Sequence, residues 1–346
     1  MSTTSIKEVA RHAGVSLGTV SNVLNHPDLV AADTRRRVLD AIAELGYVRN
    51  ESARQLRAGR SRHIAIVVLD VANPFFTDVV RGAEDAVEDS GVAVMVCNSA
   101  DNAGREQRHL DILEEQRIRG VLITPVDDSR GSRLEKFIQR GTPVVLVDRN
   151  SGRHNRCSVA VDDVLGGRLA GRHLVGTGHR HIAFVGGPLT IPQVADRHSG
   201  VAAAVADHDG VTLTVLPTPN LTVAAGRAAA GELADLAPAS RPTAAFCAND
   251  LLALGVLQEM TKRGLRVPDD IAIVGYDDIE FAAAAAVPLS SVRQPREQLG
   301  RTAAQLLLEE IEAGDKHEHR HVVFQPELVV RASSEVAPKP RRAKDP

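Results

Sequence analysis

Cysteine is scarce in this sequence, and long apolar runs are missing. Of 346 residues only three are cysteines, Cys97, Cys157 and Cys247, and their spacing matches neither a CxxC pair nor a metal-binding cluster. Two of them lie in apolar, strand-like segments, which favours reduced, buried thiols. No apolar run approaches membrane-spanning length, and Lys7 and Glu8 interrupt the region where a signal peptide needs an apolar segment. We therefore expect a cytoplasmic protein with no membrane partner.

Motifs of the common enzyme classes are also missing. No GxGxxG follows the first apolar strand, and the chain contains no GxxxxGK[ST], GxSxG or HExxH. The alternating His317, His319 and His321 form a weak metal-binding pattern, for which a solvated rim is the better interpretation. We therefore expect no enzyme, no cofactor and no bound metal.

Charge is distributed unevenly along the chain. Residues 1–62 carry ten Lys and Arg against six Asp and Glu, a charge of +4, whereas the whole chain has a net charge of −3 and the remainder therefore −7. A basic N-terminus on a neutral-to-acidic body favours a polyanion as the partner of that N-terminus. The length suits two or three lobes and leaves room for one small added module.

Two short helices are predicted at the N-terminus. Ser5 and Glu8 fit a capping box before a helix over residues 6–13, and Gly14 can take the left-handed conformation that ends it. Ser16 can cap the next helix at once, so the two helices meet at a tight glycine turn.

The second helix, over residues 17–24, is expected to bury its valines and to expose a small, polar face. A third helix should begin at a cap provided by Asp33 or Thr34 and end at Gly46. Such a small polar face fits into a major groove, where Asn22 can pair with an adenine edge. The alternative is a small helical bundle that contacts other proteins.

From His63 onward, short apolar runs alternate with helical patterns. The runs are HIAIVVLD, VAVMVCN, GVLITPV, PVVLVD, HIAFVGG, TLTVLP, TAAFCAND and IAIVGYDD. Such strands indicate parallel sheets covered by helices on both faces. A break near residues 158–162 divides the series into two doubly wound lobes with a cleft between them. A last helix over residues 298–312 and the strand-like HVVFQPELVV should return to complete the lobes.

The N-terminal segments SIKEVARHAGVSLGTVSNVLN and TRRRVLDAIAELGYVRNESARQLRAGRS resemble the DNA-binding head and hinge of the lactose/galactose-repressor family of bacterial transcription regulators. The resemblance continues to about residue 332. It implies a small all-α helix-turn-helix head and an α/β body of two doubly wound parallel-sheet lobes of periplasmic-binding-protein type. The expected domains are the head (1–49), a hinge helix (50–60), a two-lobed effector-binding and dimerisation domain (61–334) and a disordered tail (335–346).

The resemblance also implies which residues contact DNA. Its base-reading positions fall on Leu17, Gly18 and Asn22, and because Gly18 has no side chain, DNA shape should contribute to recognition. In the hinge, Leu56 would be the wedge that opens a base step in the minor groove; the alternative is a plain linker. The full expected set is Ser16, Leu17, Gly18, Thr19, Ser21, Asn22, Asn25, Arg35, Asn50, Ala53 and Leu56.

Candidate ligand-binding residues follow the carboxyl ends of the predicted strands, where open parallel sheets bind ligands. Carboxylates, an arginine and an amide around an aromatic pair suit the hydroxyls and the flat face of a sugar. With the residues that the resemblance adds, the expected set is Asn73, Phe75, Phe76, Asp148, Arg149, Arg197, Asn249, Asp277 and Gln294.

Two positions depart from the family pattern. Leu221 stands where relatives often carry an aromatic stacking residue, and Asp163 replaces the usual Asn. Structural alternatives also apply to the candidates themselves: Asn73-Pro can be a turn, the phenylalanines can only pack, and Asp250 is expected to cap its helix.

Together these features predict a homodimeric transcription regulator, in this family most often a repressor, that binds an inverted-repeat operator on double-stranded DNA at the nucleoid. The expected effector is a sugar bound between the lobes. Two alternatives within the same fold are a purine or a protein corepressor. A solute-binding protein for transport is a rival from another class, but it would need an export signal and would lack the head.

Overall fold

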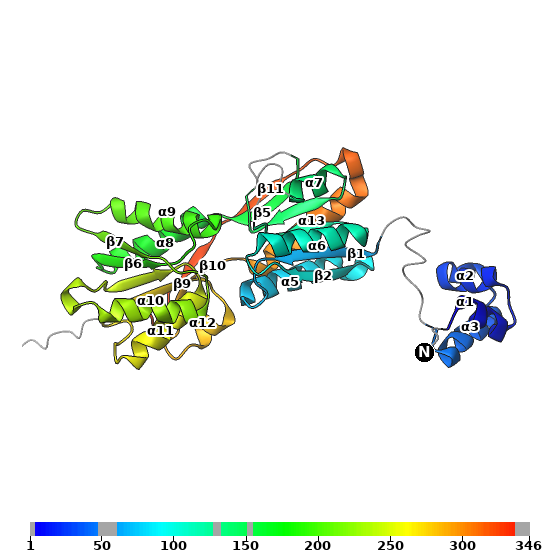
Figure 1. Ribbon diagram of the computed structural model, residues 1–346, viewed down its shortest axis with the longest axis horizontal. Coiled ribbons are helices and arrows are strands. Elements are labelled where there is room, and N and C mark those ends of the chain that lie inside the picture. The colour runs from blue at the N-terminus through cyan, green and yellow to red at the C-terminus, as the bar shows by residue number, and fades with distance from the viewer. Residues whose placement is uncertain (1–3, 48–60, 127–132, 151–154, 336–346) are drawn as a thin grey trace, which may run out of the picture. The chain divides into compact units, whose positions relative to one another are not determined.

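The computed structural model describes most of the chain, namely residues 4–47, 61–126, 133–150 and 155–335. The chain divides into two compact units, Met1–Ser61 and Arg62–Pro346 (Figure 1). The first unit is the helical head and the second is the α/β body. The hinge expected at residues 50–60, and the expected tail apart from Glu335, lie outside the described residues.

Within its described residues the head contains α1 (Ile6–Ala13), α2 (Leu17–Asn25), the 3-10 turn η1 (Pro27–Leu29) and α3 (Ala32–Leu45). The predicted capping box is confirmed: the Ser5 side chain accepts from Glu8 N–H, and the Glu8 carboxylate accepts from Ser5 N–H at 2.6 Å. Gly14 ends α1 with φ of 63°, and Ser16 caps α2. These local hydrogen bonds set where the two short helices begin and end, and the packing of their buried valines and alanines stabilises them.

The start of α3 differs from the prediction. Its N-cap is Ala31, which offers no side-chain hydrogen bond, and Asp33 lies in the first turn, where it pairs with Arg36 at 3.0 Å. An acidic residue in the first turn still stabilises the helix through its dipole, without capping it. Gly46 ends α3 as predicted. The core of the head consists of small side chains from all three helices: Val9, Ala10, Ala13, Val20, Val23, Val38 and Ala41.

The first lobe of the body contains a parallel sheet in the order β11-β5-β4-β3-β1-β2. Its strands are β1 (His63–Val68), β2 (Ala93–Asn98), β3 (Val121–Ile123), β4 (Val144–Val147), β5 (Cys157–Val161) and β11 (His321–Phe324). Every residue of β3, β4 and β5 is buried, whereas the edge strands β2 and β11 are partly exposed. Near-continuous apolar strands therefore mark the interior of the sheet, as the sequence predicted.

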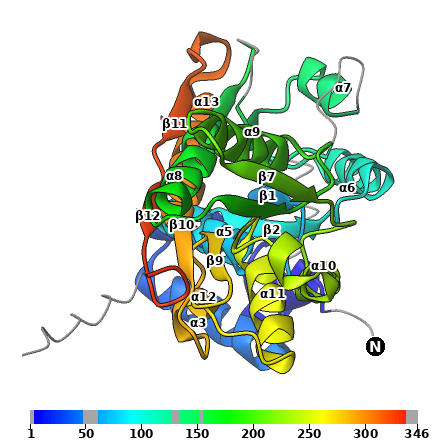
Figure 2. The ribbon, with the colours of Figure 1, turned by 90° about the vertical axis from the view of Figure 1, so that its left-hand side faces the viewer.

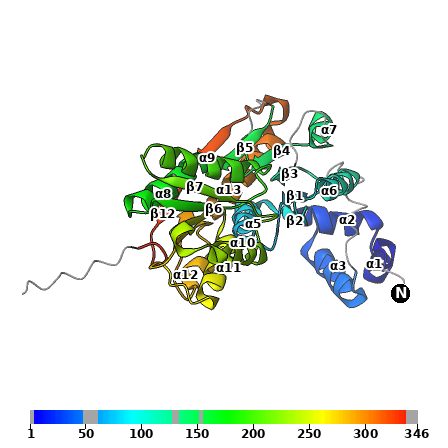
Figure 3. The same cartoon turned by 60° about the vertical axis from the view of Figure 1, so that its left-hand side comes forward.

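Helices cover both faces of this sheet (Figure 3). Ile64 and Ile66 pack against α5 and α13, whereas the alternate residues Ala65 and Val67 pack against α6 and α7. This alternation follows from the two-residue period of a strand. The helical segments of the lobe are α5 (Pro74–Val87), η2 (Glu88–Ser90), α6 (Ala103–Glu115), α7 (Arg133–Gln139), α13 (Arg296–Ala313) and η4 (Gly314–Lys316).

The second lobe repeats the arrangement with the strand order β12-β10-β9-β8-β6-β7, in which β12 alone runs antiparallel to its neighbour. Its strands are β6 (His181–Val185), β7 (Thr212–Leu216), β8 (Ala244–Cys247), β9 (Ala272–Asp277), β10 (Ser290–Arg293) and β12 (Glu327–Val329). Figure 2 shows α8 and α9 on one side of these strands and α10, α11 and α12 on the other. Its helical segments are α8 (Asp163–Gly176), α9 (Pro192–Ala206), α10 (Val223–Asp235), η3 (Pro238–Ser240), α11 (Asp250–Lys262) and α12 (Glu280–Ala284).

The chain crosses between the lobes at three places. It leaves the first lobe after β5, returns after β10 to form α13, and crosses again between β11 and β12. The predicted division of the chain near residues 158–162 agrees with the first of these crossings, but residues 158–161 belong to the buried strand β5 of the first sheet, which the sequence did not predict. The predicted return of the last helix and strand is confirmed, with HVVFQPELVV split into one strand for each lobe.

Three helix pairs in the body approach each other through glycines. A Cβ atom on Gly167 of α8 would lie 2.0 Å from the carbonyl oxygen of Arg197, and one on Gly200 of α9 would lie 2.1 Å from that of Val164. Gly82 with Gly300, and Gly226 with Gly255, make equally close contacts between α5 and α13 and between α10 and α11. The α8–α9 contact holds the backbone of Arg197, so this packing positions a side chain of the cleft.

Candidate functional site

The exposed face of α2 has the small and polar character that the sequence predicted. Val20 and Val23 are buried, whereas Leu17, Gly18 and Asn22 are exposed, Leu17 by 40%. An exposed leucine beside an exposed amide offers one apolar and one hydrogen-bonding group to a base edge. The geometry of this face therefore suits a major groove.

Other predicted DNA-contact residues of the head make hydrogen bonds within it. Ser16 Oγ accepts from Thr19 N–H at 3.1 Å, and Asn25 Nδ2 donates to Ser21 O at 2.8 Å. These bonds stabilise the ends of α2. The side chains of Ser16 and Asn25 therefore have a structural role in the head, whether or not they also contact phosphates. Arg35 is half-buried on α3. The remaining predicted residues, Asn50, Ala53 and Leu56, lie outside the described residues.

The body contains a cavity at the carboxyl ends of strands from both lobes, where open parallel sheets bind ligands. Its volume is about 70 Å³, several times the 10–15 Å³ that one water needs on this measure. It is lined by Leu69, Asp70, Asn73, Phe75, Phe76, Asp101, Asp148, Ile191, Gln193, Val194, Arg197, Asn220, Leu221, Thr222, Asn249 and Asp277.

Most of the predicted ligand-binding residues meet in this cavity, but two do not line it. Arg149 is half-buried beside the lining residue Asp148, and Gln294 is buried behind Asp277, to which its Nε2 donates at 2.7 Å. Gln294 therefore orients a carboxylate of the cavity from behind. The predicted residues that do line it are Asn73, Phe75, Phe76, Asp148, Arg197, Asn249 and Asp277.

Several lining residues were missed by sequence reasoning. Asp70 and Asp101 follow β1 and β2, so the rule that selected Asp148 could have found them. Gln193 lies in the first turn of α9, which follows β6, so the same rule applies to it, but its contact with Asp148 depends on the approach of the two lobes. Leu221, which the sequence marked as a departure from the family pattern, is also in the lining.

Arg197 is the central buried cation of the site and is 4% exposed. Its Nε donates to Asp163 Oδ1 and its Nη1 to Ala248 O, both at 2.8 Å. The guanidinium also lies 3.8 Å from the centre of the Tyr276 ring. Asp163, the second departure from the family pattern, is thus the ion-pair partner that holds Arg197 in place.

Asp148 combines strain, burial and an unsatisfied oxygen. Its φ of 53° is in the left-handed region, which is costly for a residue with a Cβ atom. The Gln193 amide donates to its carbonyl oxygen and, at 3.2 Å, to Oδ2, whereas Oδ1 is buried without a hydrogen-bond partner among the described residues. Burial, followed by the charge of Asp163, raises the pKa of Asp148 to about 8. Oδ1 of this carboxyl group therefore lacks a hydrogen-bond partner, and a hydroxyl group, which both donates and accepts, could serve in either protonation state.

Asp277 is the matching carboxyl group of the second lobe and also has a positive φ, of 105°. Asn73 of the first lobe donates to its Oδ2 at 3.4 Å. Burial raises the pKa of Asp277 to about 6, although Arg197 and Gln294 act to lower it. The Asn73–Asp277 and Gln193–Asp148 contacts both join the two lobes, so groups that line the cavity also hold the lobes together.

Some of the candidate ligand-binding residues also cap a helix or pack in the core of a lobe. Asn73 caps α5 by accepting from Phe75 N–H at 3.1 Å, so its turn role and its place in the cavity coexist. Phe75 and Phe76 form an edge-to-face pair in the core of the first lobe, with ring centres 5.0 Å apart. Their rings therefore line the cavity from a fixed position.

The predicted cap of α11 is wrong. Asn249, not Asp250, is the N-cap, because its side chain accepts from Leu252 N–H at 3.0 Å. Asp250 is fully buried and accepts from Ser291 Oγ and Ile279 N–H, at 2.7 and 2.9 Å. These hydrogen bonds hold the loop that follows Asp277 against the start of α11.

In the part of the chain that the structure describes, no helix has the length and apolar character to cross a membrane.

Known proteins resemble this chain along nearly its whole length. Residues 5–50 match the family described as bacterial regulatory proteins, lacI family, and residues 172–334 match a periplasmic binding protein-like domain. The HTH-type transcriptional repressor PurR of Aliivibrio fischeri (strain MJ11) is 34% identical over 334 residues, 95% of this chain and 97% of that repressor.

Solved structures agree with this match. The lac repressor dimer bound to operator and the anti-inducer ONPF has a TM-score of 0.83 at 27% identity, covering 97% of this chain and 100% of that chain. The complex of the transcriptional regulator CelR with cellobiose has a TM-score of 0.68 at 33% identity, covering 95% of this chain and 99% of that one.

Proposed function

This chain belongs to the lacI family of bacterial regulatory proteins and is a DNA-binding transcriptional regulator, not an enzyme, and from this premise we propose that its effector is a sugar. The sugar would bind in the cavity between the lobes and control the affinity of the head for its operator. Asp148, Asn249 and Asp277 would accept or donate hydrogen bonds to its hydroxyls. Arg197 would reach it from α9, and the rings of Phe75 and Phe76 would contact its C–H groups.

The observation that carries this proposal is the surplus of hydrogen-bond acceptors in the cavity. Four aspartates, Asp70, Asp101, Asp148 and Asp277, belong to its lining, and Oδ1 of Asp148 is buried without a hydrogen-bond partner among the described residues. An ionised carboxylate only accepts hydrogen bonds, whereas Asp148, whose pKa is raised to about 8, is protonated at neutral pH and also carries one O–H donor. The ligand must therefore supply several donors and at least one acceptor, and a hydroxyl group offers both. A sugar carries a hydroxyl on most of its carbons, whereas a nucleobase has few N–H groups.

A purine is the second candidate. Sequence identity does not separate the two, because the 34% to a repressor named PurR is close to the 33% to CelR, which was solved with cellobiose. In favour of a flat base are the apolar lining residues Leu69, Ile191, Val194 and Leu221 together with the two phenylalanines. Against it stands Leu221, which offers no aromatic face for stacking.

For the DNA-binding function, we propose that α2 enters the major groove, with Asn22 and Leu17 at base edges and Ser16, Thr19 and Arg35 near phosphates. A pair of chains would bind an inverted repeat, with Leu56 of each hinge as a wedge in the minor groove. The lac repressor, 27% identical, was solved as a dimer on its operator, which supports the homodimer. Protein corepression remains the alternative if no small molecule binds.

Coupling between ligand and DNA would run through the contacts that join the lobes. A ligand that takes up hydrogen bonds of Asp148 or Asp277 competes with Gln193 and Asn73, so it changes the free energy of lobe closure. Coupling energies in such systems are about 1–3 kcal/mol. Either sign is compatible with this scheme, release from DNA or recruitment to it.

A thermal-unfolding screen of the full chain against monosaccharides, disaccharides and nucleobases tests the effector. A sugar at about 100 times its Kd should stabilise the chain by about 2.7 kcal/mol, and nucleobases should not. Stabilisation by nucleobases alone would replace the sugar by the purine. The active compound should then alter the mobility shift of a palindromic promoter fragment, and an active compound without effect on that shift would contradict the coupling.

A further inference from the structure

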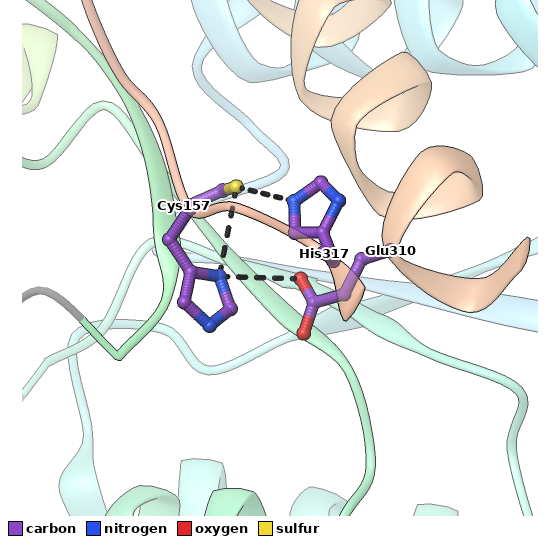
Figure 4. Close-up of side chains that lie close together, drawn as sticks. Cys157, Glu310 and His317 are labelled. Atoms are coloured by element: carbon purple, nitrogen blue, oxygen red, sulfur yellow. Dashed lines mark hydrogen bonds and ion pairs between the residues drawn. The ribbon is translucent and has the colours of Figure 1, made fainter. Parts of the chain in front are cut away.

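A second cluster of chemically reactive side chains lies in the first lobe and belongs to neither the cavity nor the head. Cys157 is the first residue of β5, Glu310 lies in the last turn of α13, and His317 and His319 lie on the segment between η4 and β11 (Figure 4). Pairing of β5 with β11 brings these segments together, since Ser158 is the partner of His321 in the parallel register. Cys157 thus meets, at one edge of the sheet, three residues that lie 153 to 162 positions further along the chain.

The ligand atoms of the cluster are close enough to share one ion. Cys157 Sγ lies 3.2 Å from His317 Nε2 and 3.9 Å from His319 Nδ1, and His319 Nδ1 lies 4.0 Å from Glu310 Oε2. All four ligand atoms lie within 4.8 Å of one another. Metal–ligand bonds of about 2.0–2.3 Å in a tetrahedron place neighbouring ligand atoms about 3.3–3.6 Å apart. Shifts of a few tenths of an ångström to about an ångström would therefore complete the tetrahedron.

From this geometry we propose that Cys157, Glu310, His317 and His319 bind one divalent transition-metal ion of the zinc class. One thiolate, two imidazoles and one carboxylate match the ligands that Zn²⁺ takes in four-coordinate sites. Sulfur and nitrogen ligands disfavour Mg²⁺ and Ca²⁺, which prefer oxygen. From the sequence, a solvated rim is the expected place of the histidines, because only their alternation along the chain is visible there. The sequence does not reveal that Cys157 and Glu310 lie next to them.

The surroundings of the cluster favour a cation. Oε2 of Glu310 is buried without a hydrogen-bond partner among the described residues, and the Cys157 side chain is also buried. The backbone N–H of Arg320 donates to Cys157 Sγ at 3.3 Å, which stabilises a thiolate. The positive charge of the nearby Arg156 is balanced by Glu135, whose carboxylate lies 2.6 Å from the guanidinium, so Arg156 repels a bound cation only weakly. A cation would therefore satisfy a buried oxygen that receives no hydrogen bond from the described residues and has only His319, at 4.0 Å, as an ion-pair neighbour.

Binding would tie three segments together. The ion would join the C-terminal end of α13 to the start of β5 and to the segment that leads into β11. At its other end α13 begins with Arg296, whose Nη1 donates to Asp278 O at 2.6 Å beside the cavity. The bound ion would thus crosslink the C-terminal end of α13, the helix that begins beside the cavity, to the edge of the first sheet. Metal binding should therefore raise the unfolding temperature of the body.

Cobalt titration of the full chain, produced without an affinity tag and stripped of metal, tests this proposal. We expect one Co²⁺ per chain, an intense near-ultraviolet absorption from thiolate-to-cobalt charge transfer, and visible bands of tetrahedral cobalt that Zn²⁺ abolishes. Cys157→Ser should remove the charge-transfer band. His319→Gln should lower the affinity by more than about 100-fold, since loss of an outer-shell partner alone costs about 10–100-fold.

Cys97→Ser is the matched control, because Cys97 lies on β2 of the same sheet and outside the cluster. It should bind Co²⁺ as the unaltered chain does. Should Cys157→Ser fail to fold, His317→Gln and His319→Gln on the partly exposed segment carry the test, with circular dichroism as the check of folding. Co²⁺ binding without a charge-transfer band, or wild-type affinity in both histidine variants, would overturn the proposal. The effector plays no part in this experiment, so its outcome is independent of the proposed function.

Discussion

Asp148 and Asp277 show how single buried residues make the cleft sensitive to pH. Burial raises the pKa of Asp148 to about 8 and that of Asp277 to about 6, far above the value of about 3.9 for an unfolded Asp. From about pH 4 up to these raised pKa values, the two carboxyl groups hold their protons in the folded chain and lose them in the unfolded chain. The free energy of unfolding must therefore fall as the pH rises through this range. The cost is absent below about pH 4 and complete above about pH 8.

Asp148→Asn should therefore stabilise the ligand-free protein at high pH. The gain should be on the order of a few kcal/mol larger at about pH 8.5 than at about pH 5, since each pKa unit corresponds to about 1.4 kcal/mol. Urea unfolding at both pH values measures it, and the same variant should bind the effector more weakly. Asp209→Asn, at an exposed site, serves as control. An identical pH dependence in Asp148→Asn and the unaltered chain would show that this carboxyl group is not the cause.

Asn22 is the residue of the head on which base recognition should depend most. Asn22→Ala should cost about 1–3 kcal/mol of operator binding and relax the preference at one position of each half-site. Removal of Arg35 should instead weaken binding to all sequences and lower the salt slope by about one. Selection from a randomised operator library, with and without each substitution, separates the two effects. If Asn22→Ala weakens operator and random DNA equally, Asn22 does not read a base.

At the scale of elements, the body is organised by helix pairs that meet through glycines. Gly167 of α8 and Gly200 of α9 let the two backbones approach so closely that a methyl group would collide with a carbonyl oxygen. Such contacts are rigid, because neither side has a flexible side chain that could yield. They fix the α-helix that carries Arg197, and through it the polar network of the cavity.

Gly167→Ala and Gly176→Ala compare a close and an open position on the same helix. A Cβ at Gly167 would lie 2.0 Å from Arg197 O, whereas nothing lies within 4 Å of a Cβ at Gly176. Gly167→Ala should therefore destabilise the body by about 1–3 kcal/mol and weaken effector binding. Gly176→Ala should be neutral or stabilise it by up to about 1 kcal/mol, given the higher helix propensity of alanine. Thermal unfolding of both variants measures this, and equal stabilities would contradict the packing described here.

At the scale of the whole molecule, two units of different chemistry share one chain. The head has a small core of three helices, and the body has its own cores and cavity. DNA binding and effector binding should therefore be separable, although their coupling requires the full chain.

A chain that begins at Arg62 should lose operator binding and keep the effector affinity of the full chain within about two-fold, because the cavity is lined by the body alone. Mobility shift and calorimetry on the two chains measure this. Retained operator binding in the shorter chain would rule out the head as the DNA-binding unit.

Local signals were sufficient for most elements. The capping box at Ser5, the cap at Ser16 and the stop at Gly14 act over three or four residues, so the pattern alone predicts them. The strand β5 was not predicted because it is short and lies next to a lobe crossing. The cap of α11 was assigned to the wrong neighbour because Asp and Asn are both good caps, and only burial separates Asn249 from Asp250.

The sequence by itself thus determined the helices of the head, most strands, the two-lobed body and seven of the sixteen residues that line the cavity. Periodicity, capping and the rule for strand ends are all local. Only the tertiary structure decided that Gln193 and Asn73 bridge the lobes, that Asp163 holds Arg197, and that Cys157 meets His317. Those contacts join residues far apart in the chain, and the pairing of strands and the closure of the lobes fix their distances.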